Sequence, residues 1–89
     1  MNFIKVPQVD EERLDDELIL LHPATLQVKF LNETATVLWD ALDAFPTADG
    51  LAGLLTEARP ELSSAESLAH VTTFLEELMA AGLVERSSP

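Results

Sequence analysis

The sequence predicts an α+β domain in which a three-stranded antiparallel sheet is followed by three helices. Two patterns predict this class. Short β-rich segments separated by turn signals fill the first third of the chain, and apolar residues three and four apart fill the rest. Because 89 residues leave room for only one hydrophobic core, we expect a single domain over residues 1–86. The last three residues, 87–89, are expected to form a frayed tail.

The three strands differ in the strength of their signal. Residues 6–14 are the weakest candidate because acidic residues interrupt the alternation. Residues 17–22 are apolar on both faces, which is typical of a central strand. Residues 26–31 alternate, with Leu26, Val28 and Phe30 on one face. Short turns between successive strands predict an antiparallel meander, in which the third strand lies at an edge.

The three helices are marked by caps and by periodic apolar residues. Asn32 caps the first helix, and Thr47 caps the second, which Pro60 ends. Ser63 and Glu66 form a capping box at the start of the third helix, and Gly82 ends it. Residues 83–85 are expected to add a short strand or to pack on the core.

Composition and charge exclude several classes of protein. Sixteen acidic residues outnumber five basic residues, and the net charge of −11 disfavours nucleic acid and anionic membranes as partners. The chain has no cysteine, so disulfides, thiol nucleophiles and cysteine-ligated zinc are excluded. The first seven residues lack the apolar stretch of a signal peptide. We therefore expect a cytoplasmic protein.

The residues that could carry chemistry form no constellation. His22 and His70 are tied neither to each other nor to a nucleophile, and Ser63, Ser64 and Ser67 are explained by helix capping. We expect no catalytic residue, no metal site and no cofactor. The acidic run over residues 10–17 contains no glycine, so it does not resemble an EF-hand loop. It is interpreted as a solvated surface or as an electrostatic landing surface for a basic partner.

The third helix carries a wider apolar arc than a small core requires. Val71, Leu75 and Leu78 lie at the centre of the arc and are assigned mainly to the core. One flank carries Leu68, Thr72 and Met79, and the other carries Phe74 and His70. The extra apolar surface indicates either dense core packing or a groove for a peptide. The groove is considered because β-augmentation uses an edge strand beside an apolar helix.

Three segments resemble the PqqD family. They are ELILLHPAT at residues 17–25, VKFLNETA at residues 28–35, and the helical residues Val71, Phe74, Leu75 and Leu78 followed by Gly82-Leu83-Val84. The order and spacing of the three segments together are more specific to the family than any single segment. The similarity covers roughly residues 8–86, although Gly50 and Gly53 depart from the usual second helix.

The resemblance implies a winged helix-turn-helix-like recognition element for ribosomally made, post-translationally modified peptides. Such a domain binds the leader segment of a precursor peptide as an added strand, performs no chemistry and presents the precursor to a maturation enzyme. The implied peptide-binding strand is residues 27–31. The expected peptide-binding residues are Gln27, Val28, Lys29, Phe30, Leu31, Leu68, Val71, Thr72, Leu75 and Met79. The flank of Leu68, Thr72 and Met79 is favoured because methionine adapts well to a bound partner.

Several functions remain open at the level of sequence. The favoured one is a free-standing leader-binding protein of a lasso-peptide pathway, which works with a leader peptidase and a cyclase. The alternative is a PqqD-type chaperone for a radical enzyme in pyrroloquinoline quinone biosynthesis. A winged-helix DNA-binding domain is disfavoured because residues 63–81 contain no Lys or Arg. A dimerisation domain would use the surplus apolar surface as its interface.

Overall fold

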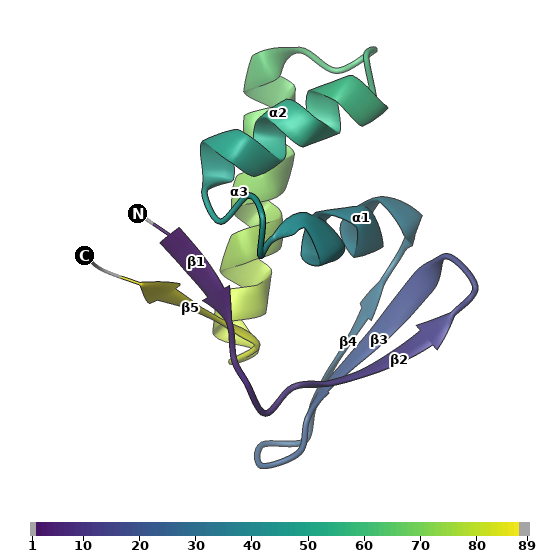
Figure 1. Ribbon diagram of the computed structural model, residues 1–89, viewed down its shortest axis with the longest axis vertical. Coiled ribbons are helices and arrows are strands. Elements are labelled where there is room, and N and C mark those ends of the chain that lie inside the picture. Colours follow the sequence, from purple (N-terminus) through teal and green to yellow (C-terminus); the bar gives the residue numbers. More distant parts are fainter. Residues whose placement is uncertain (1, 88–89) are drawn as a thin grey trace.

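The computed structural model describes residues 2–87 and confirms the predicted order of a three-stranded sheet followed by three helices (Figure 1). The three-stranded sheet projects from one side of the helices, and a second, two-stranded sheet lies on the other side (Figure 1). In chain order the elements are β1 (Asn2–Lys5), β2 (Asp10–Leu14), β3 (Glu17–His22), β4 (Gln27–Leu31), α1 (Glu33–Ala41), α2 (Ala48–Ala58), α3 (Ser64–Ala80) and β5 (Val84–Ser87).

The three-stranded sheet has the order β2-β3-β4, and both pairings are antiparallel. β3 is the central strand, as its sequence predicted, and β4 lies at an edge. Leu18 and Leu20 on β3 are buried in the core at 1% and 0% exposure. The sheet therefore contributes one face to the core and one edge to the surface.

The faces of β4 are the reverse of what its apolar alternation suggests. Leu31 is buried, whereas Val28 and Phe30 are 49% and 73% exposed. Register explains this arrangement: Leu31 lies opposite Leu18 in the antiparallel ladder, and directly opposed residues share one face of a sheet. Lys29 and Leu31 thus face the helices, and Val28 and Phe30 point away from them.

The two-stranded sheet of β1 and β5 was not predicted. It joins the two ends of the described chain, with Asn2 paired with Ser87 and Lys5 paired with Val84. The expectation of a tail beginning at residue 87 is therefore wrong for Ser87, which belongs to β5; residues 88 and 89 lie outside the described part. The two alternatives expected for residues 83–85 are both present: Leu83 packs in the core, and Val84 begins the strand β5.

The predicted helix caps are present as hydrogen bonds. Oδ1 of Asn32 accepts the N–H of Ala35 at 2.9 Å, and Oγ1 of Thr47 accepts the N–H of Gly50 at 3.0 Å. In α3 both bonds of the capping box form between Ser63 and Glu66. At the other end of α3, Gly82 has φ +74°, a conformation in which glycine avoids the Cβ clash of other residues.

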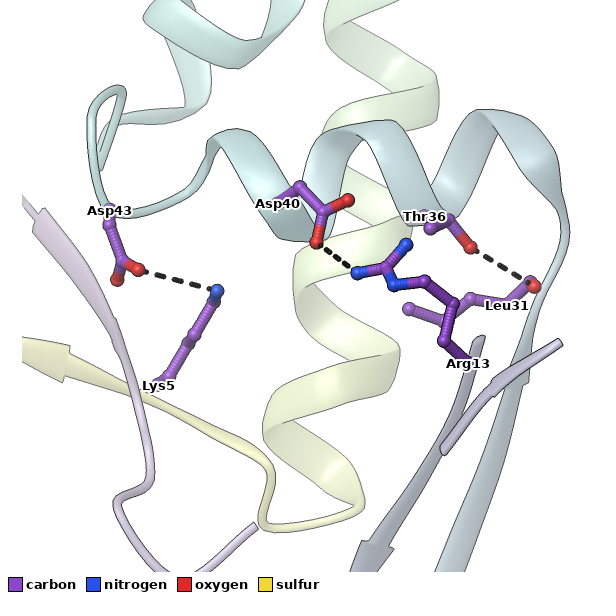
Figure 2. A network of polar contacts seen from close by, with 6 residues as sticks. All are labelled: Lys5, Arg13, Leu31, Thr36, Asp40 and Asp43. Carbon is purple, nitrogen blue, oxygen red and sulfur yellow. Dashed lines mark hydrogen bonds and ion pairs between the residues drawn. The ribbon is translucent and has the colours of Figure 1, made fainter. Parts of the chain in front are cut away.

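Polar contacts join the two sheets to α1 and to the turn that follows it (Figure 2). Arg13 of β2 donates to Asp40 at 2.9 Å, and Nζ of Lys5 lies 3.4 Å from Asp43. The hydrogen bond to Asp40, together with the charge of that carboxylate, raises the pKa of Arg13 above its ordinary value. Thr36, which is buried, donates its hydroxyl to the carbonyl of Leu31 at 3.3 Å. These contacts set the position of the three-stranded sheet relative to the helices.

The core lies where the three helices meet the two sheets. Trp39 is fully buried at its centre, and Nζ of Lys5 lies 4.7 Å from the centroid of the indole ring. Val71, Leu75 and Leu78 are buried, so their assignment to the core is confirmed. Within residues 2–87, no helix is both long enough and apolar enough to cross a bilayer.

Candidate functional site

β4 has a free edge, and one of its side chains reaches α3. β4 pairs with β3 along one side, and no other strand among residues 2–87 pairs with it along the other. Nζ of Lys29 lies 2.9 Å from Oε2 of Glu77, so the middle of β4 is held close to the C-terminal half of α3. Alternate backbone N–H and C=O groups of an edge strand point outward, where they are able to pair with another chain.

A cavity of about 600 Å³ opens between α1, α3 and the end of α2, and its lining includes Asn32, which follows β4, and Glu77, the partner of Lys29. Its apolar lining includes Leu38 of α1, Leu55 of α2, and Leu62, Ala69 and Phe74. Phe74 is 9% exposed, so its ring forms part of the wall while packing in the core. A cavity with this lining is suited to one or two apolar side chains.

Polar groups surround the cavity. Asn32, Thr34, Arg59, His70 and Glu77 all contribute to its lining. Nη2 of Arg59 donates to Oγ1 of Thr34 at 3.1 Å, and Nη1 lies 3.5 Å from Oε2 of Glu61. The polar rim would orient the backbone of a bound chain, while the apolar wall would receive its side chains.

Some of the expected peptide-binding residues lie where a peptide can reach them. Gln27, Val28 and Phe30 are exposed on β4, and Lys29 is half-buried. Leu31, Val71 and Leu75 are 3%, 0% and 1% exposed. These three side chains are packed in the core, and their contact with a peptide stays a prediction. Truncating Leu75 to Ala would cost about 2–5 kcal/mol of stability, so it would act on folding before it acted on binding.

The two flanks of α3 have different surroundings. At about 100° per residue, Leu68, Thr72 and Met79 lie on the side of the helix opposite His70, Thr73 and Glu77. The cavity lining includes His70, Thr73 and Glu77 and none of the first three. Leu68 and Thr72 are exposed, and Met79 packs partly on the core. The flank favoured by sequence thus faces away from the cavity, and its role in binding stays a prediction.

Sequence reasoning did not find Ala69, Thr73 and Glu77 as candidate site residues. Phe74 and His70 were recognised, but only as the less favoured flank. The one feature in the sequence that relates to this site is the opposite charge of Lys29 and Glu77, which form the ion pair between β4 and α3. That signal has no meaning in sequence until the strand and the helix are known to lie side by side.

The other polar candidates have structural partners. The hydroxyl of Thr56 lies 2.8 Å from Oγ of Ser67, which is fully buried between α2 and α3. Nδ1 of His22 accepts the N–H of Ala24 at 3.2 Å within its own turn. Among the described residues, no group of three or more His, Asp or Glu side chains could hold a metal ion.

The sequence profile of the family described as "Coenzyme PQQ synthesis protein D (PqqD)" matches residues 17–84, which run from the start of β3 to the start of β5. The chain belongs to the PqqD family. No curated protein sequence matches the chain.

Two solved structures have the same fold as this PqqD-family chain. One is described as "TbiB1 in Complex with the TbiA(beta) Leader Peptide"; it has a TM-score of 0.83 and 19% identity, covering 96% of this chain and 98% of that one. The other is described as "Lasso peptide synthetase B1 complexed with the leader peptide"; its TM-score is 0.83 with 19% identity, covering 97% of this chain and 100% of that one. At this identity the likeness shows a shared fold over nearly the whole length of both chains.

Proposed function

We propose that this PqqD-family domain binds the leader segment of a ribosomally made precursor peptide as a fourth strand of the β2-β3-β4 sheet. The observation that carries the proposal is the free edge of β4, a strand that the Lys29–Glu77 ion pair joins to the cavity-lining side of α3. Both structural neighbours are described as complexes with a leader peptide, which supports the same role for this chain.

The groove supplies two kinds of interaction. The outward backbone groups of β4 would form a ladder with the leader, which provides affinity with little dependence on sequence. Side chains of the leader that point toward α3 would enter the cavity walled by Leu38, Leu62 and Phe74, which provides selectivity. We propose the flank of His70, Thr73 and Phe74 as the leader-facing side of α3, since the cavity lies there.

The domain would act by delivery and without chemistry of its own. Its proposed binding surface combines a backbone edge, an apolar wall and a polar rim, which suits holding an extended peptide. We favour a lasso-peptide pathway, in which the bound precursor is passed to a leader peptidase and a cyclase. The lasso-peptide protein among the neighbours supports this choice.

A second candidate is a peptide chaperone in pyrroloquinoline quinone biosynthesis. The family match favours it, because the family is described by that pathway. The two candidates share the same groove and differ in the precursor and in the enzyme that receives it. Titrating the chain with the leader of a lasso precursor and with the quinone precursor peptide separates them by affinity.

The binding mode is tested by nuclear magnetic resonance. The ¹⁵N-labelled chain is titrated with a synthetic peptide that has the sequence of the leader encoded beside it. Amide signals of residues 27–31 and 69–77 should shift, and hydrogen exchange of alternate β4 amides should slow as they gain partners. A scrambled leader is the control. Shifts confined to α2 or to the β1–β5 sheet would contradict the proposal.

A further inference from the structure

The outer face of the three-stranded sheet carries an apolar surface that no helix covers. Ile19 lies opposite Phe30 and Leu21 lies opposite Val28, so these four side chains form one continuous patch. Phe30 is 73% and Val28 is 49% exposed. A hollow of about 250 Å³ between Leu14, Ile19 and Phe30 borders the patch. A contiguous apolar patch on a small soluble domain is typical of an interaction surface.

Acidic residues border this patch along β2 and at the start of β3. The antiparallel register places Glu12 beside Ile19 and Asp10 beside Leu21, and Glu17 lies on the same face of β3. The two cations of the sheet, Arg13 and Lys29, point to the opposite face, where each is paired with a carboxylate of a helix. The outer face of β2, β3 and β4 therefore carries negative charge and no positive charge.

The negative charge of the outer face indicates which kind of partner would bind it. A second copy of this chain would bring its own net charge of −11 and a second acidic border against the first. A surface with an apolar centre and Lys or Arg side chains along one side would complement both features. The occupant that fits is thus a different protein with a basic rim.

The outer face is separate from the leader groove. Side chains alternate across a strand, so Ile19 and Leu21 point away from the helices, while Lys29 on the other face of the sheet reaches Glu77 of α3. A leader strand added to β4 would leave the outer face open. We propose that this outer face docks the maturation enzyme while the edge of β4 and the cavity of α3 hold the leader. The face consists of Leu14, Ile19, Leu21, Val28 and Phe30, with Asp10, Glu12 and Glu17 beside them. The proposal rests on the proposed function, because it presumes a precursor to be delivered.

The experiment measures two affinities on the same variants. The probes are the purified leader peptidase encoded beside this chain and the synthetic leader peptide, and the peptidase is titrated with and without leader. One variant, Leu14→Thr with Ile19→Thr, removes apolar contacts, and Val37→Thr on α1 is its control, since Val37 is 44% and Leu14 is 53% exposed. A second variant, Asp10→Lys with Glu12→Lys, reverses the acidic border, and Glu57→Lys on α2 is its control.

The expected result is selective loss of enzyme binding. The apolar variant should raise the Kd for the peptidase by about tenfold or more, as hot-spot contacts do. The charge variant should slow association with the peptidase and remove its dependence on salt. Both controls should bind the peptidase like the wild-type chain, and leader affinity should not change in any variant.

Three outcomes would overturn the proposal. Peptidase affinity unchanged in both face variants would place docking elsewhere. An equal loss of leader affinity would make the face part of the leader site. A wild-type dimer that the apolar variant converts to a monomer, measured by light scattering, would make the face an interface between copies. Failure of the wild-type chain to bind leader would refute the proposed function separately, because peptidase binding is also measured without leader.

Discussion

The ammonium group of Lys29 on β4 lies 2.9 Å from the carboxylate of Glu77 on α3, so one ion pair joins the edge strand to a residue that lines the cavity. The two side chains are 32% and 53% exposed. Exposed ion pairs contribute about 0–1 kcal/mol to stability because water screens them. The pair therefore contributes little to the stability of the fold, whereas Glu77 lies where a peptide in the cavity would reach it.

Glu77→Gln should separate the effect of this residue on stability from its effect on leader binding. The free energy of unfolding should change by less than about 1 kcal/mol, since the pair is exposed. Leader affinity should fall, because Glu77 lines the cavity and holds the edge of β4 near α3. Glu76→Gln is the matched control, an adjacent exposed glutamate outside the cavity lining. Denaturant titration and fluorescence anisotropy measure the two quantities; equal leader affinities for both variants would contradict this role.

Proline substitution in β4 tests the strand edge directly. Proline lacks the N–H, so replacing a residue whose N–H points outward removes a bond to the leader and none to β3. A scan over residues 27–30 should find positions at which leader affinity falls while circular dichroism stays native. If every natively folded variant kept full affinity, the backbone of β4 would not be the binding element.

Local signals were sufficient to predict most of the elements. Asn32, Thr47 and Ser63 cap helices because the side chain of each accepts an N–H of the first turn. This interaction depends only on a few adjacent residues, so the sequence alone predicts it. The apolar run of β3 likewise marks a strand with neighbours on both sides. The order of the sheet and the helices followed from these signals.

Features that depend on distant contacts were not predictable in the same way. β1 pairs with β5 across nearly the whole chain, and four-residue strands have no local pattern of their own. Phe30 is exposed and Leu31 is buried because the helices cover one face of the sheet, which alternation alone cannot identify. The flank of α3 that we propose to face the leader depends in the same way on where β4 lies.

The second helix contains a site at which stability should increase. A Cβ at Gly53 would meet nothing within 4 Å, so Gly53→Ala should raise the free energy of unfolding by about 1 kcal/mol through helix propensity. A Cβ at Gly50 would lie 3.1 Å from Oγ1 of Thr47, the cap of α2. Gly50→Ala should therefore gain less. Equal gains in thermal unfolding would contradict the tight contact at the cap.

The capping box of α3 should make stability depend on pH. The N–H of Ser63 donates to Glu66 at 2.9 Å, which lowers the pKa of this carboxyl in the folded chain below its ordinary 4.5. A carboxylate with a lowered pKa stabilises the fold above its unfolded pKa, and this contribution is lost as pH falls through the folded value. Glu66→Gln keeps the capping geometry but cannot titrate. The stability difference between wild type and variant should shrink below pH 4.5; a constant difference would contradict the assignment.

Two adjacent threonines on α3 test the central claim most directly. Thr73 lines the cavity between α1 and α3, whereas Thr72 is exposed on the flank with Leu68 and Met79. Because both side chains are exposed, Thr73→Glu and Thr72→Glu should unfold at similar temperatures. The measurement is the Kd of each variant for the leader peptide. The account predicts that Thr73→Glu weakens binding by about tenfold or more, by placing a charge against the bound strand, and that Thr72→Glu binds like wild type. Loss of binding in Thr72→Glu alone, or in neither variant, would contradict it.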